Sequence, residues 1–131
     1  MNRKVEREQV FILLFEKCFS NESLDDIISL AEESRDFTIT EYILSTFKGV
    51  YDNLDIINNI ISKFSKKNYE LNRISKVVLS ILRLAIYEIK YIDDIPESVS
   101  INEAVELSKK YGHNQDASYV NGLLGEFVRS E

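Results

Sequence analysis

The chain has 131 residues, of which 44% are hydrophobic and 29% are charged, as in an ordinary globular domain with one hydrophobic core. Its net charge of −6 argues against nucleic-acid binding over the whole surface but leaves room for a local basic site. A single cysteine and a single histidine exclude an intramolecular disulfide and give no zinc pattern, and no apolar run is long enough for a membrane span.

Hydrophobic periodicity predicts a chain built from helices alone. With four glycines and one proline, the sequence offers few tight turns, which favours long helices joined by short loops. The expected helices cover about residues 3–19, 24–31, 39–52, 55–64, 76–92, 101–111 and 116–128, with a short helical turn near 71–74. The fold class is therefore all-α, in a single domain over residues 1–131.

Capping signals mark the ends of three of these helices. Thr38 with Glu41, and Ser100 with Glu103, have the Ser/Thr-x-x-Glu spacing of a capping box, so we expect Thr38 and Ser100 to be N-caps. Gly112 lies where a C-terminal glycine cap is expected.

The segment 76–92 carries apolar residues round most of its circumference, which predicts burial at the centre of the fold. Arg83 interrupts it. A buried guanidinium must be paired or hydrogen-bonded, so Arg83 is either a core residue with such a partner or a functional residue at a surface groove. The same two interpretations apply to Asn102 and Asn121, which lie next to core positions.

No motif in the sequence indicates catalysis. The four glycines are scattered and form no phosphate-binding loop, and the only histidine, His113, follows a helix end in a polar loop. Asp93 and Asp94 precede Pro96 and are typical of a turn. We therefore expect no enzyme activity, no catalytic residue, no metal and no cofactor, and a location in the cytosol away from membranes.

Several linked motifs in the C-terminal half resemble those of the NusB family of bacterial transcription antitermination factors. They are ILRLAIYEI at 81–89, DDIP at 93–96, INEAVEL at 101–107, KKYG at 109–112 and YVNGLL at 119–124. The resemblance is strong over roughly residues 74–124. The basic residues near the front of the chain also resemble the arginine-rich start of the family.

The resemblance implies an all-helical, compact bundle of about seven helices in two sub-bundles, one over about residues 1–65 and one over about 70–131. It also implies a non-enzymatic protein that binds the boxA element of ribosomal RNA transcripts together with the ribosomal protein NusE. Such a protein joins an RNA polymerase antitermination complex and promotes read-through of terminators.

Residues matching the family motifs become candidate sites. Arg3, Lys4 and Arg7 correspond to the RNA-binding start of the family and fall within one arc of a helix. We expect replacement of Arg3 and Arg7 by alanine to weaken RNA binding while thermal stability stays nearly unchanged. Motif residues that serve either the fold or a contact are Arg83, Glu88, Asn102, Glu103, Asn121 and Gly122.

Three further residues have two interpretations each. Lys109 and Lys110 either contact RNA phosphate or interact with the helix dipole. Tyr119 either stacks on an RNA base or packs within its helix.

An alternative function also stays open. Because the N-terminal basic run is diluted by Val5 and Glu6, the chain could instead be a helical protein–protein module that binds NusE or forms a homodimer.

Overall fold

A computed structural model describes residues 2–34, 38–65 and 71–130, and these ranges contain helices and no strand. The helices are α1 (Arg3–Lys17), α2 (Leu24–Ser34), α3 (Glu41–Asp52), α4 (Leu54–Phe64), the short 3-10 helix η1 (Leu71–Arg73), α5 (Lys76–Tyr91), α6 (Glu97–Tyr111) and α7 (Asp116–Ser130). The predicted all-α class is confirmed, with seven α-helices in the described ranges.

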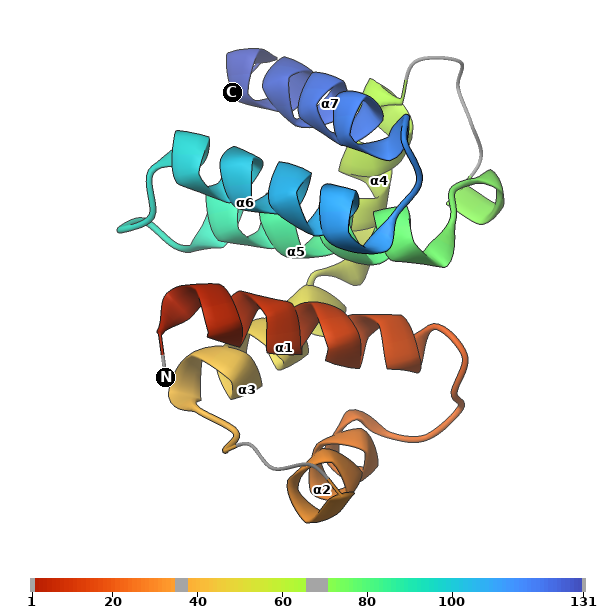
Figure 1. Ribbon diagram of the computed structural model, residues 1–131, viewed down its shortest axis with the longest axis vertical. Coiled ribbons are helices and arrows are strands. Elements are labelled where there is room, and N and C mark those ends of the chain that lie inside the picture. Colours follow the sequence, from red (N-terminus) through yellow and green to blue (C-terminus); the bar gives the residue numbers. More distant parts are fainter. Residues whose placement is uncertain (1, 35–37, 66–70, 131) are drawn as a thin grey trace.

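Helix α5 lies at the centre of the molecule, as its apolar circumference predicts. It contacts α1, α3, α4, α6 and α7, and its fully buried side chains include Ile81, Leu82 and Ile86. Figure 1 shows α1, α2 and α3 grouped in one part of the molecule, and α4 to α7 grouped in the other. Helix α4 lies in the range that the family resemblance assigns to the first sub-bundle, and it packs against α5 and α7 as well as α3.

Both predicted capping boxes are wrong in detail. Helix α3 is capped by Thr40 rather than Thr38, because the Thr40 hydroxyl accepts the Ile43 N–H at 3.3 Å. Helix α6 begins at Glu97, directly after Pro96, whose φ of −59° suits the first turn of a helix. Ser100 therefore lies inside the helix, and its hydroxyl is free to bind a side chain instead of the backbone.

Gly112 ends α6, as predicted. A glycine is required there because neighbouring atoms lie too close for a Cβ, and not because the backbone is left-handed. Its φ is −101°, and its N–H donates to Ser108 O at 2.9 Å. A Cβ at this position would lie 2.6 Å from Asp116 Oδ2, which accepts the His113 N–H at 2.8 Å. The glycine thus lets α7 begin directly beside the end of α6.

The described residues lack two features that would be relevant to function. None of their helices combines the length and the apolar character that crossing a membrane requires. In the same ranges, no group of three or more His, Cys, Asp or Glu side chains has a geometry that could hold a metal ion.

Candidate nucleic-acid interface

A narrow groove separates α1 from α6 and collects several of the candidate residues. We call it the α1–α6 groove. It is lined by Lys4, Arg7, Glu8, Glu103, Glu106, Leu107 and Lys110. Side chains that are about 100 positions apart in the chain therefore meet here, since Lys4 lies opposite Glu103 and Glu8 lies opposite Lys110.

Both lysines of the groove are paired with carboxylates. Lys110 Nζ donates to Glu8 Oε2 at 2.6 Å, and Lys4 Nζ donates to Glu103 Oε2 at 3.2 Å. The hydrogen bond from Lys110 lowers the pKa of Glu8, and the same bond raises the pKa of Lys110. Because both ammonium groups lie at the surface, they can also reach a ligand in solvent.

Arg7 has a different environment. Its side chain is only 8% exposed, and its Nε donates to Glu88 Oε2 at 2.7 Å. Glu88 is itself 1% exposed and also accepts from the Tyr42 hydroxyl and, at 2.8 Å, from the Ser100 hydroxyl. The expectation that Arg7 can be replaced without loss of thermal stability does not fit a side chain buried and paired in this way.

Arg3 lies at the start of α1, next to the groove but outside its lining. Its guanidinium carbon is 4.1 Å from the centre of the Tyr42 ring, and its Nε donates to Glu6 Oε1 at 3.3 Å. Lys109 lies near the other end of the groove, on the exposed surface of α6, and its Nζ is 3.7 Å from Glu106 Oε1. Both cations remain open to solvent on one side.

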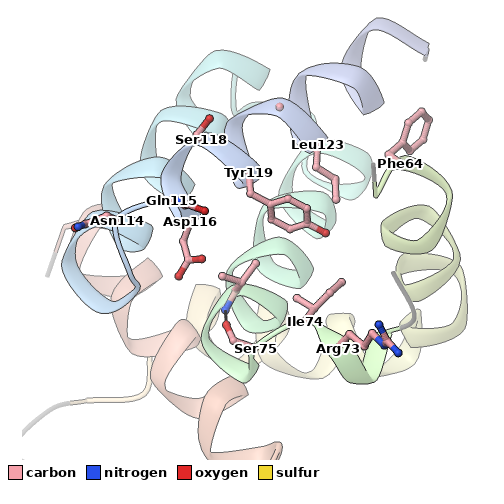
Figure 2. A pocket seen from close by; sticks show the side chains of 12 residues that line it. Phe64, Arg73, Ile74, Ser75, Asn114, Gln115, Asp116, Ser118, Tyr119 and Leu123 are labelled. Carbon is pink, nitrogen blue, oxygen red and sulfur yellow. Dashed lines mark hydrogen bonds between the residues drawn. The ribbon is translucent and has the colours of Figure 1, made fainter. Parts of the chain in front are cut away.

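Tyr119 belongs to a separate and larger cleft, which we call the Tyr119 cleft. It has a volume of about 830 Å³ and lies between α7, the beginning of α5 and the end of α4. Its lining consists of Phe64, Arg73, Ile74, Ser75, Val78, Asn114, Gln115, Asp116, Ser118, Tyr119, Gly122 and Leu123. Figure 2 shows the Tyr119 ring projecting from α7 into the middle of this cleft, above Ile74.

The Tyr119 ring both packs and remains accessible. It is half-buried against the core, and its hydroxyl is 2.8 Å from Ser65 Oγ. Arg73 lies at the rim of the same cleft and is exposed. The cleft therefore combines an aromatic ring with a nearby cation, the two groups that single-stranded nucleic acid most often contacts.

The motif residues divide into three groups. Glu88 is buried, whereas Arg83 is half-buried and its Nε donates to Asn58 Oδ1 at 3.1 Å. Glu103 and Gly122 line the α1–α6 groove and the Tyr119 cleft respectively. Asn102 and Asn121 are exposed rather than buried, so the interpretation as core polar residues is wrong for both.

The structure brings Lys4, Arg7 and Lys110 into one groove, but Tyr119 lies elsewhere. Sequence reasoning missed two features. Arg73 belongs to a basic segment, and its position at the end of a short helical turn was the available signal. The pairing of Glu8 with Lys110 had no local signal, because the two residues are 102 positions apart.

The model of the NusB family matches residues 4–129, and the chain belongs to this family. It is 44% identical to transcription antitermination protein NusB of Acetivibrio thermocellus, over 98% of this chain and 90% of that protein. It is also 42% identical to the protein of the same name from Natranaerobius thermophilus, over 96% of this chain and 94% of that protein.

Solved structures agree with this assignment. The structure of NusB from T. maritima has a TM-score of 0.89 and 34% sequence identity, and the match covers 100% of this chain and 93% of that chain. A NusB solved with NusE and double-stranded RNA has a TM-score of 0.85 at 21% identity, covering 98% of this chain and 97% of that chain. At that identity, the second likeness supports the fold alone.

Proposed function

We propose that this chain is a non-enzymatic transcription antitermination factor that binds boxA RNA of ribosomal RNA transcripts together with the ribosomal protein NusE. In this role it acts in the cytosol as part of an RNA polymerase complex that reads through terminators. The observation that carries the proposal is the 44% identity to a transcription antitermination protein NusB over 98% of the chain.

The α1–α6 groove and its ends supply cations for RNA phosphates. Arg3, Lys4, Lys109 and Lys110 all extend into solvent near the groove. Each phosphate contact made by such a cation releases counterions, so binding through them weakens as salt rises. Arg7 contributes by position instead, because its guanidinium is held by Glu88 and fastens the first turns of α1 against α5.

The Tyr119 cleft supplies a place for a base. Stacking of a base on an aromatic ring is worth about 1–3 kcal/mol and requires an exposed ring face. The cleft volume of about 830 Å³ falls within the range of small-molecule sites and is ample for one nucleotide. Arg73 at the rim is suited to the phosphate of the nucleotide that enters.

The net charge of −6 and the paired state of both groove lysines mean that few free cations face the RNA. We therefore infer that NusE contributes a substantial share of the affinity. A NusB of the same fold has been solved with NusE and double-stranded RNA.

The test is a titration of boxA RNA and a scrambled RNA of equal length, each with and without NusE. We expect tighter binding of boxA than of the scrambled RNA, a further gain with NusE, and a decrease in affinity with rising salt. Equal affinities for the two RNAs in both conditions would exclude the proposed function.

The alternative of a protein–protein module has one observation in its favour: both groove lysines already bind carboxylates. This alternative predicts binding of NusE, or self-association into a homodimer, without any preference for boxA. The same titration, followed by measurement of the NusE complex without RNA, distinguishes the two functions.

A further inference from the structure

The acidic side chains of the α1–α6 groove balance its basic ones. Three carboxylates, from Glu8, Glu103 and Glu106, line the groove with three cations, from Lys4, Arg7 and Lys110. The closest of the contacts between them is the one between Lys110 Nζ and Glu8 Oε2, at 2.6 Å. An RNA phosphate that approaches this groove therefore meets cations that are already paired with carboxylates of the same chain.

We propose that Glu8 sets the RNA affinity of the groove by holding Lys110 in competition with RNA phosphate. The inference rests on the proposed function, since it concerns the same surface.

The geometry of the Glu8–Lys110 pair is that of an ion pair that RNA can break. Lys110 is 59% exposed and Glu8 is 28% exposed, so water reaches both groups. An exposed ion pair contributes only about 0.2–1 kcal/mol to stability. An RNA phosphate can therefore replace the Glu8 carboxylate as the partner of Lys110. The pair links a residue of α1 to a residue of α6, so it is not an interaction within one helix. Its loss therefore leaves the backbone hydrogen bonds of both helices intact.

The pair contrasts with the neighbouring contact between Arg7 and Glu88. That contact is closed to solvent, and Glu88 receives two further hydrogen bonds from hydroxyl groups. Breaking it would leave the buried Glu88 carboxylate without its cation. Of the cations that line the groove, Arg7 is therefore fixed, whereas Lys110 can exchange one anionic partner for another at little cost.

The mechanism makes a specific prediction about salt. A lysine that leaves a carboxylate for a phosphate releases the counterions of that phosphate, but the carboxylate it leaves attracts a cation from solution. The net release of cations is therefore smaller than for a free lysine. Freeing Lys110 should therefore strengthen binding and also steepen the salt dependence. The opposite mechanism, in which Glu8 orients Lys110 for RNA contact, predicts weaker binding once the carboxylate is removed.

The experiment compares Glu8→Gln with the wild-type chain, with boxA RNA and scrambled RNA of equal length as the probes. Glutamine keeps the size of the side chain and removes its charge. We expect affinity to rise about two- to fivefold for both RNAs, which corresponds to the release of one exposed ion pair. The slope of log K against log salt should steepen by up to about 0.7, the value for one phosphate on a single strand.

Two further variants make the comparison specific. Asp25→Asn removes one negative charge from another exposed pair, in which Lys48 Nζ lies 2.9 Å from Asp25 Oδ1, on α2 and α3 outside the groove. It should leave RNA affinity unchanged. Glu8→Gln should have little effect in a Lys110→Gln background, because the residue that the carboxylate holds is then absent.

The inference is overturned if Glu8→Gln leaves affinity unchanged or lowers it. It is also overturned if the gain persists in the Lys110→Gln background, since Glu8 would then act by simple repulsion. Failure of the proposed function has a different signature. In that case the wild-type chain binds both RNAs equally, while the effect of Glu8→Gln on either RNA still decides the role of Glu8.

Discussion

Arg7 Nε donates to Glu88 Oε2 at 2.7 Å and thereby joins the first turns of α1 to the last turns of α5, across 81 positions of sequence. Tyr42 of α3 and Ser100 of α6 donate to the same carboxylate. One buried carboxylate thus connects four helices. The N-terminal turns of α1, which carry the candidate RNA-binding residues, are therefore fastened to the centre of the fold.

Arg7→Ala should lower the free energy of unfolding by about 3–5 kcal/mol, because it leaves the Glu88 carboxylate buried without its cation. Chemical denaturation with urea measures the change. Arg3→Ala is the matched control, since the Arg3 side chain is exposed, and it should cost less than about 1 kcal/mol. Similar, small losses in both variants would mean that the contact between Arg7 and Glu88 contributes little to stability.

Because the Tyr42 hydroxyl is buried, we expect the free energy of unfolding to depend on pH in the alkaline range. Burial, followed by the nearby Glu88 carboxylate, raises the pKa of Tyr42 above its ordinary value of 10.0. Because the folded state favours the protonated phenol, this contribution to stability is complete below about pH 10 and is lost as the pH rises further. Urea unfolding of the wild-type chain and Tyr42→Phe should therefore differ most near neutral pH.

The difference between these two proteins should narrow above about pH 10. Tyr51, Tyr87 and Tyr111, whose pKa values are also raised by burial, are present in both proteins, so their effects cancel in the comparison. Parallel stability curves from neutral to alkaline pH would contradict the assigned role of Tyr42.

Gly122→Ala should separate stability from RNA binding. A Cβ on Gly122 would meet no heavy atom within 4 Å, and the residue lies inside α7. Alanine should therefore stabilise the helix by up to about 1 kcal/mol. Because Gly122 lines the Tyr119 cleft, the added methyl group should at the same time weaken boxA binding. Thermal unfolding and RNA titration test the two effects, and unchanged boxA affinity would indicate that RNA does not approach α7 at this position.

Tyr119→Leu should weaken boxA binding by about 1–3 kcal/mol through loss of base stacking. Tyr119→Phe keeps the ring and loses only the hydrogen bond with Ser65, so it should bind RNA nearly as well as the wild-type chain. Titration of both variants with boxA RNA checks this. Equal losses in the two variants would point to the hydroxyl rather than the ring as the group that RNA needs.

The sequence predicted those features of the fold that depend on local pattern. The apolar circumference of 76–92 correctly indicates a central helix, because burial on most sides leaves only a narrow polar strip, which carries Lys76, Arg83 and Lys90. The N-cap of α3 was misplaced by two residues, because Thr38 and Thr40 both precede Glu41 and only the folded backbone decides which hydroxyl reaches an N–H.

The candidate site was predicted less completely, for a physical reason. The family resemblance identified Lys4 and Lys110, and they do meet in one groove. Their carboxylate partners, Glu103 and Glu8, lie about 100 positions away in the chain, and no local spacing reveals such pairs. Likewise, nothing in the sequence of the N-terminal helix distinguishes the buried Arg7 from the exposed Arg3 and Lys4.

The central claim is that boxA RNA lies along the α1–α6 groove and enters the Tyr119 cleft. The most direct measurement is photo-cross-linking of thiouridine-substituted boxA RNA to the complex of this chain with NusE, followed by identification of the cross-linked peptides. We expect cross-links in the first turns of α1, at the end of α6 and in α7 around Tyr119. Cross-links confined to α2 and the exposed side of α3, with none in those three segments, would contradict the account.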